Sequence, residues 1–141
     1  ENIDILTNSL YTSPNPFAIS GYMNHRERIV DNSTNVYEFQ GPGSIHAKSY
    51  IFDNRISAVG SFNFDSRSSY LSTETMVIID SKEFAKDLEE EIGKYIGSSL
   101  KVGEDYSYIS DPLVKEENVP LMKSIIQKIF SVIIYFFEFM L

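Results

Sequence analysis

Residues 45–74 read IHAKSYIFDNRISAVGSFNFDSRSSYLSTE, and they are the most informative part of the chain. Two runs, 45–52 and 55–59, flank Asp53-Asn54, a pair that suits a tight turn. The stretch therefore predicts a β-hairpin with His46 and Lys48 on its first strand. Because side chains at positions i and i+2 of a strand share a face, the imidazole and the ammonium are expected to point the same way.

The polar side chains of this stretch suit chemistry on a phosphodiester. A phosphodiester is anionic and resists attack by water, so a catalyst must neutralise its non-bridging oxygens and supply a nucleophile. Lys48 can place an ammonium beside a phosphoryl oxygen, and the Ser61 hydroxyl and Asn63 amide can donate hydrogen bonds to others. The neutral imidazole of His46 can act as the nucleophile. The competing interpretation is that His46 is only a hydrogen-bonded strand histidine, which an isolated histidine would favour.

Written as a pattern, the stretch is HxK(x)4D(x)6GSxN, and it resembles the HKD signature of the phospholipase D superfamily. Each fixed position matches by chance roughly one time in twenty, so the pattern together with Glu74 has odds on the order of one in 10^9. The resemblance implies transfer or hydrolysis of phosphodiesters through a phosphohistidine. It also implies that Glu74 is the carboxylate that holds the histidine ring in place.

Flanking segments resemble, more narrowly, the C-terminal half of bacterial cardiolipin synthase-like proteins, over roughly residues 3–98. These segments are 5–10, 21–22, 36–38, 60–68, 73–74 and 77–80. Such proteins typically carry two HKD motifs, which meet at a pseudo-twofold axis, and this chain holds one. The resemblance therefore implies a partner, which is either an upstream half or a second copy in a homodimer. One histidine makes the phosphoenzyme and the other protonates the leaving alcohol, and the sequence does not say which of them is His46.

The remaining residues of the motif are expected to support the site. Asp53 suits the hairpin turn, and Gly60 suits a close approach of two backbone segments. Asp65, Arg67 and Ser68 are expected to form a layer of ion pairs and hydrogen bonds behind the site. The phenylalanines that alternate with Ser61 and Asn63, at positions 62 and 64, are expected in the core.

Composition limits the partners that this chain can have. It has 141 residues, of which 12 are basic and 20 acidic, for a net charge of −8. An acidic domain repels nucleic-acid backbones, so nucleic acid is disfavoured as the main partner, although a local basic pocket could still bind it. The absence of cysteine rules out disulfides and thiolate metal sites. With two histidines and no cluster at metal-ligand spacing, we expect no metal and no other cofactor.

The rest of the chain predicts alternating strands and helices. Strands are expected at 3–6, at 36–39 and, buried, at 76–79. A helix capped by Asn15 should begin at Pro16 and end near residue 30, and a second should follow a cap at Asp80 or Ser81. The predicted class is thus α/β (mixed α+β), and the resemblance implies a phospholipase D-like mixed sheet flanked by helices. Residues 1–98 form the HKD half-domain, 99–120 a loop-rich connector and 121–141 an apolar C-terminal helix.

The apolar segment 121–141 has three possible roles: a helix packed on the domain, an interfacial membrane anchor, or a surface that a missing half covers. Its uncharged part is too short for a bilayer span of about 20 residues, and packing or partner contact is favoured over insertion into lipid. At the other end the chain begins with Glu1 rather than Met, so we expect it to be part of a longer protein or the product of a split gene.

The sequence predicts a phosphatidyltransferase that resembles cardiolipin synthase and passes a phosphatidyl group from one phospholipid to the hydroxyl of another. Water would compete as the acceptor. Two alternatives stay open: a homodimeric single-HKD nuclease or phosphodiesterase, and an inactive fragment that serves as an association or membrane module. The expected location is the cytoplasmic face of the cell membrane, as a peripheral protein, or the cytoplasm.

Overall fold

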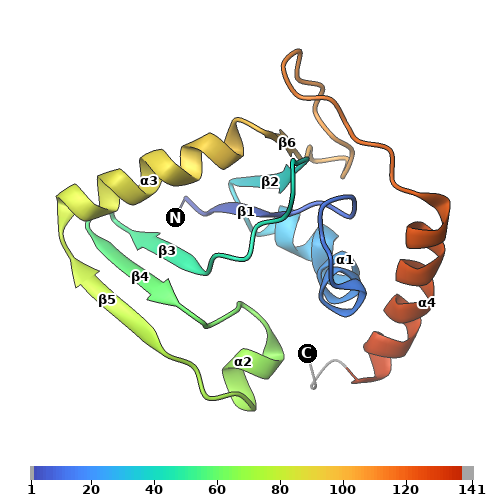
Figure 1. Ribbon diagram of the computed structural model, residues 1–141, viewed down its shortest axis with the longest axis horizontal. Helices are drawn as coiled ribbons and strands as arrows, with labels where there is room; N and C mark the ends of the chain where they lie inside the picture. The colour runs from blue at the N-terminus through green and yellow to red at the C-terminus, as the bar shows by residue number, and fades with distance from the viewer. Residues whose placement is uncertain (1, 138–141) are drawn as a thin grey trace. The chain divides into compact units, whose positions relative to one another are not determined.

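The computed structural model describes residues 2–137, which form six strands and four helices (Figure 1). In chain order the elements are β1 (Asp4–Asn8), α1 (Pro16–Asp31), β2 (Asn35–Phe39), β3 (Ser49–Phe52), β4 (Ile56–Gly60), α2 (Ser66–Tyr70), β5 (Met76–Asp80), α3 (Lys82–Ile96), β6 (Ser99–Lys101) and α4 (Leu121–Phe137). They belong to two compact units, one of residues 2–45 and 96–137, the other of residues 46–95. The predicted mixed α/β class is confirmed, and the strands are divided between two three-stranded sheets.

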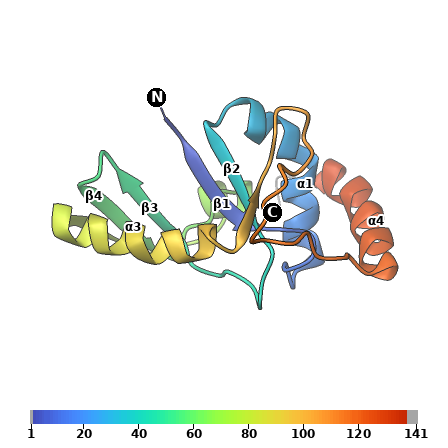
Figure 2. The ribbon, with the colours of Figure 1, turned by 90° about the horizontal axis from the view of Figure 1, so that it is seen from above.

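The first unit is built around the sheet β1-β2-β6. β1 runs parallel to β2 and α1 connects them, whereas β6 is antiparallel to β2. α1 lies between this sheet and α4 (Figure 2). The buried apolar side chains of the unit are Ile19, Val36, Phe39, Leu100, Val102 and Ile134. β6 lies inside the predicted connector 99–120, and a strand of 3 residues is too short to show a periodic pattern.

Helix α1 begins where the sequence predicts. The Asn15 side chain accepts hydrogen bonds from the backbone N–H groups of Phe17 and Ala18, at 3.0 and 3.3 Å. Pro16 occupies the first turn, where its missing N–H costs nothing. An amide cap followed by proline is a local signal, so no tertiary contact is needed to predict this helix start.

A buried carboxylate, that of Glu38 on β2, ties together three segments of the first unit. Its side chain is 1% exposed and accepts hydrogen bonds from the Tyr22 hydroxyl at 2.7 Å, from Arg26 Nε at 2.5 Å and from the Tyr108 hydroxyl. Arg26 also donates from Nη1 to the carbonyl of Tyr106 at 2.7 Å. Burial, and then the negative charge of Glu38, raise the pKa of both tyrosine hydroxyls. These partners come from distant parts of the sequence, so the pattern of residues gave no sign of the cluster.

The second unit is built around the antiparallel sheet β3-β4-β5. Asp53 and Asn54 join β3 to β4, each with a φ of +51°, which confirms the predicted hairpin turn. The prediction that the strand at 76–79 is buried is wrong, because Val77 and Ile78 of β5 are 58% and 66% exposed. β5 pairs only with β4 and forms an edge of the sheet, so a run of apolar residues there is not covered within residues 46–95.

The predicted apolar segment 121–141 is helical over Leu121–Phe137 as α4, and positions 138–141 lie outside the described residues. Within residues 2–137, no helix combines the length and the apolar character that crossing a bilayer requires.

Candidate active site

The topology of the second unit brings the residues of the motif to one end of its sheet. His46 and Lys48 come just before β3, the segment 61–65 just follows β4, and Glu74 comes just before β5. Because β4 is antiparallel to both neighbours, the start of β3, the end of β4 and the start of β5 lie at the same end. Backbone bonds from Gly60 N to the Lys48 carbonyl, 3.1 Å, and from Ser61 N to the Thr75 carbonyl, 3.0 Å, hold the three segments together.

His46 and Lys48 do not lie on a strand, so that prediction is wrong. β3 begins at Ser49, opposite Val59, and the ladder cannot continue far because β4 ends at Gly60. The two side chains nevertheless lie together: Lys48 Nζ is 2.8 Å from His46 Nε2 and 3.0 Å from the His46 carbonyl oxygen. An ammonium can only donate, so in this arrangement Nε2 is the acceptor and the proton of the neutral ring is on Nδ1.

The carboxylate of Glu74 is held by two serine hydroxyls. Ser61 Oγ donates to Oε2 at 2.5 Å, and Ser68 Oγ donates to Oε1 at 3.0 Å. The hydrogen bond from Ser61, and after it that from Ser68, lower the pKa of Glu74, and the positive charges of Arg67 and Lys48 act in the same direction. Glu74 therefore stays ionised to lower pH than an ordinary glutamate.

Asn63 is joined to the same cluster through Ser68. Ser68 Oγ accepts from the Asn63 backbone N–H at 3.2 Å and, weakly, from its Nδ2 at 3.5 Å. Ser68 itself is fixed by Asp65, whose side chain accepts from the Ser68 backbone N–H at 2.7 Å and caps α2. The Asn63 amide has two N–H groups, so one of them is available to a ligand beyond this contact.

The backbone at Gly60 has no room for a side chain. A Cβ at this position would lie 2.0 Å from the Thr75 carbonyl oxygen and 2.6 Å from the Met76 sulfur. The predicted close approach of two backbone segments is thus confirmed, and it lets β4 and β5 run together up to the residues of the cluster.

A chain of contacts and one charge interaction links His46, Lys48, Glu74 and Asn63. His46 touches Lys48, the Lys48 charge acts on Glu74, and Ser68 connects Glu74 to Asn63. Within residues 2–137, the hydrogen bonds to Glu74 come from the serines and not from the ring of His46. The role of Glu74 in holding that ring stays a prediction.

Of three supporting residues, Asp53 lies at the predicted turn, whereas Ser61 and Asp65 make contacts other than those expected. The Ser61 hydroxyl, expected on the phosphate, donates its hydrogen to Glu74 and accepts from Thr75 N at 3.0 Å. Asp65 directly precedes α2, where the first N–H groups of the helix have no partner within it. Its side chain therefore caps this short helix instead of pairing with Arg67. Asp53 lies at the turn, the opposite end of the hairpin from the cluster.

Two aromatic residues near the cluster also need comment. Tyr50, which the sequence did not single out, donates from its hydroxyl to the Phe62 carbonyl at 2.9 Å and so anchors the segment after β4. Its signal was weak because an aromatic residue on a strand is usually core. The prediction that Phe64 is core is wrong, because it is 90% exposed in the segment between β4 and α2. As for metals, no group of three or more potential side-chain ligands gathers anywhere in residues 2–137.

Comparison with known proteins places this geometry in a family. The family model described as "Cardiolipin synthase, PLD-like domain" matches residues 1–96. An uncharacterised protein of Helicobacter pylori is 34% identical over 97 residues, which cover 60% of this chain and 19% of that protein. Cardiolipin synthase A of Yersinia pseudotuberculosis and that of Yersinia pestis are each 35% identical over 80 residues, 56% of this chain and 16% of theirs.

The chain thus spans less than a fifth of the length of these curated relatives. The family match, in contrast, covers every residue of the cluster at the end of the second sheet. The superfamily transfers phosphodiesters, which agrees with a cluster of imidazole, ammonium, amide and carboxylate. This chain belongs to the phospholipase D superfamily, as a member of the family of cardiolipin synthase PLD-like domains.

Proposed function

We propose that this chain is the C-terminal catalytic half of a phosphatidyltransferase that resembles cardiolipin synthase, and that it works through a phosphohistidine. The observation that carries the proposal is the 2.8 Å contact between Lys48 Nζ and His46 Nε2, beside a carboxylate held by two hydroxyls. The family match and the likeness to cardiolipin synthase A support the choice of a phospholipid as substrate.

The proposed reaction has two steps. In the first, a histidine nitrogen attacks the phosphorus of a phospholipid, a P–N bond forms, and the P–O bond to the headgroup alcohol breaks. The second catalytic histidine gives its proton to that leaving oxygen. In the second step the hydroxyl of another lipid attacks the phosphorus, gives its proton back to the same histidine, and breaks the P–N bond. Lys48 and the Asn63 amide stabilise the charge on the non-bridging oxygens in both transition states.

A second motif is part of the proposal, because one imidazole cannot be both the nucleophile and the acid in the same step. It would come from an upstream half or from a second copy of this chain. In support, Phe64, Tyr70 and Leu71 follow the Ser61–Asn63 segment closely and are 90%, 85% and 61% exposed. Apolar side chains so exposed beside a polar cluster suit a surface that another protein segment covers.

The experiment is to measure the exchange of phosphatidyl groups between phospholipids, by this chain alone and together with a half that carries the other motif. Rapid quenching followed by mass spectrometry would locate a phosphate on histidine. We expect His46→Ala to abolish the exchange, and His25→Ala, at the other histidine of the chain, to leave it unchanged. If the phosphate is found on His46, His46 is the nucleophile. If it is found on the histidine of the other motif, His46 is the general acid.

Other results would favour the alternatives. If the chain alone cleaved nucleic acid, and if this activity were weakened by salt and lost in His46→Ala, a homodimeric nuclease would be the better assignment. The net charge of −8 argues against this outcome, because it repels nucleic-acid backbones. Neither exchange nor phosphohistidine in the presence of the second half would leave only an association module.

A further inference from the structure

Helix α4 packs on α1 with its more polar side. The Ser20 hydroxyl donates to the Gln127 carbonyl at 3.1 Å, and the Asn24 amide donates to the Ser131 carbonyl at 3.0 Å. Gln127 is buried, and it donates from Nε2 to the Ser131 hydroxyl at 2.7 Å. The apolar residues on this side include the buried Ile134 and Phe130, whose ring lies 4.3 Å from that of Phe17.

The opposite side of α4 is entirely apolar and is exposed. At about 100° per residue, its members lie within an arc of roughly 120°. They are Leu121, Ile125, Ile129, Val132, Ile133 and Phe136, and they are between 43% and 77% exposed. We call these six residues the apolar stripe. An amphipathic helix of a soluble domain normally turns such a stripe inward, so α4 has the reverse orientation.

The charges of α4 favour a lipid surface as the partner of the apolar stripe. Its charged residues are Lys123, whose ammonium donates to the Tyr11 carbonyl on the packed side, and Lys128; Leu121–Phe137 contains no acid, although the whole chain has a net charge of −8. Lys128 is exposed and lies at the edge of the apolar stripe. A second copy packed stripe to stripe would offer Lys128 no carboxylate from its own α4, whereas a bilayer offers phosphates beside hydrocarbon.

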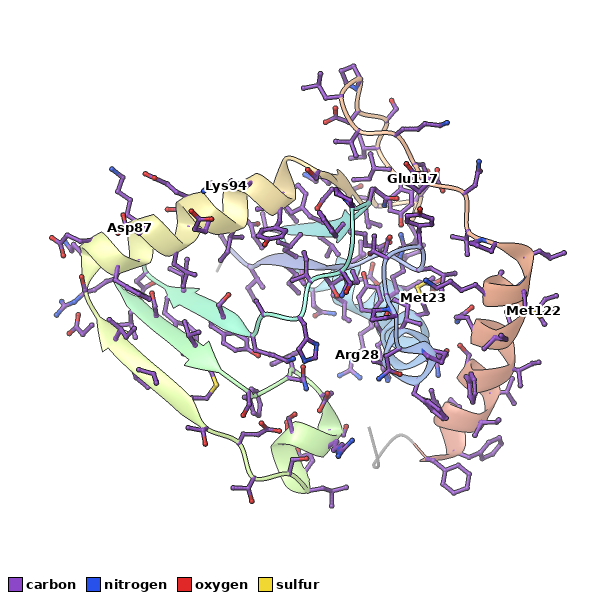
Figure 3. The ribbon with its side chains drawn as sticks, viewed as in Figure 1. Met23, Arg28, Asp87, Lys94, Glu117 and Met122 are labelled. Carbon is purple, nitrogen blue, oxygen red and sulfur yellow. The ribbon has the colours of Figure 1, made fainter. Side chains whose placement is uncertain are left out.

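A cavity beside the apolar stripe also suits lipid. It has a volume of about 370 Å³ and lies between α4 and the loop that leads into α1. Its walls include Leu10, Pro16, Ile19 and Ile126. Met122, near the start of α4 in Figure 3, lines the cavity and is itself 67% exposed, so the cavity adjoins an exposed apolar residue at the start of the helix. An acyl chain can enter such a cavity, whereas the regular side chains of a second α4 would leave it unfilled.

We propose that the apolar stripe of α4 docks this chain on a phospholipid bilayer, with the helix axis in the plane of the membrane and Lys128 at the level of the phosphates. A helix of 17 residues laid flat gives a contact about 25 Å long. This inference goes beyond the proposed function and does not depend on it, because docking needs no chemistry at the second unit.

The test is flotation of the whole chain with vesicles of phosphatidylcholine and phosphatidylglycerol, and with vesicles of phosphatidylcholine alone. We expect the chain to float with both and more strongly with the anionic ones, because of Lys128. Ile125→Glu with Ile129→Glu should lower the partition coefficient at least tenfold. Ile129→Gln should lower the partition coefficient less. A thermal unfolding curve of the Ile129→Gln variant would show that its fold is intact.

Two controls separate the possible outcomes. Leu113→Glu places the same charge at an apolar residue that is 91% exposed but lies outside α4, and should float like the parent. His46→Ala should float normally even if the proposed reaction is wrong. Equal flotation of the parent and of the double variant, or no flotation at all, overturns the inference. The inference is also overturned if the parent does not bind vesicles and sediments as a dimer, and the double variant sediments as a monomer. The partner of the apolar stripe would then be a second copy of the chain.

Discussion

The Lys48 ammonium lies 2.8 Å from Nε2 of His46, the same nitrogen whose lone pair a phosphorus atom would need. A phosphoryl oxygen carries negative charge and is a stronger partner for an ammonium than a neutral ring nitrogen. Binding of a phosphodiester would therefore draw Lys48 toward the oxygen and release the lone pair of Nε2. The same side chain would both hold the ring of His46 before substrate binds and make room for the substrate.

Replacing Lys48 by alanine should lower phosphatidyl exchange by about 10²- to 10³-fold, the usual cost of losing one charged donor to a transition state. The measurement is the exchange rate with the second half present, at saturating lipid. Lys86→Ala is the matched control, because Lys86 lies on α3 with its side chain 74% exposed and pairs with Glu90. A loss of activity in Lys86→Ala, or none in Lys48→Ala, would contradict the role of Lys48.

The ionisation of Glu74 should depend on the two serines that hold it. The bond from Ser61, and next that from Ser68, lower the pKa of this carboxyl, so Ser61→Ala and Ser68→Ala should each raise it toward the ordinary value. Ser69→Ala is the control, because the Ser69 hydroxyl donates to the Asp65 carbonyl instead. Carbon-13 NMR of the Glu74 carboxyl through an acid titration measures the shift, and a larger shift in Ser69→Ala would refute the assignment.

The pH dependence of stability follows from the same lowered pKa. A carboxyl whose pKa is lower in the folded state stabilises the fold above its unfolded pKa, and this stabilisation is lost as pH falls through the folded value. The unfolding midpoint of Ser61→Ala should therefore differ least from that of the parent in strong acid. At neutral pH the difference should be largest, since there the parent keeps the full benefit of the two hydroxyl bonds.

Local signals in the sequence predicted much of the fold. Asn15 and Pro16 start α1, Asp53-Asn54 turns the hairpin, and Ser81 accepts from the Phe84 N–H at 3.1 Å at the start of α3, because each depends on a few adjacent residues. The burial of β5 could not be predicted, because an apolar run looks the same on an edge strand as in the middle of a sheet.

The residues of the site could be predicted, but their contacts could not. The pattern from His46 to Glu74 named the groups that meet at the end of the second sheet. It could not show that Ser61 binds Glu74, because several donors and acceptors lie within reach of that hydroxyl and only the fold selects one. Nor could it show Tyr50 as the anchor of the segment after β4, since that bond ends on a backbone carbonyl.

Gly60 and Gly93 offer a matched pair of substitutions in the second unit. A methyl group at Gly60 would lie 2.0 Å from the Thr75 carbonyl oxygen, so Gly60→Ala should destabilise the fold by about 1–3 kcal/mol or more. Gly93 lies inside α3 with nothing within 4 Å of such a methyl, and Gly93→Ala should stabilise by about 0.5–1 kcal/mol. Urea unfolding measures both, and effects of the same sign would contradict the packing described for Gly60.

Alkaline pH should weaken the first unit through its buried tyrosines. Burial, and then the Glu38 charge, raise the pKa of Tyr22 and Tyr108 above the ordinary value of about 10. Their stabilising effect is complete below that value and is lost as pH rises through the folded pKa, because the unfolded chain releases these protons first. The free energy of unfolding should fall above about pH 10. Tyr22→Phe should make the fall shallower, and a steeper fall in that variant would be the contrary result.

Glu38→Gln should be among the most destabilising conservative substitutions in the chain. An amide cannot accept all three hydrogen bonds, and Arg26, with a side chain 13% exposed, would keep its charge without an anion. Breaking one partner of a buried ion pair typically costs about 3–5 kcal/mol. Asp80→Asn is the control, because the Arg55–Asp80 pair is 57% exposed on both sides and should matter by at most about 1 kcal/mol. Urea unfolding of both variants decides between the two kinds of ion pair, since equal losses would mean that the burial of Glu38 adds nothing to its contribution.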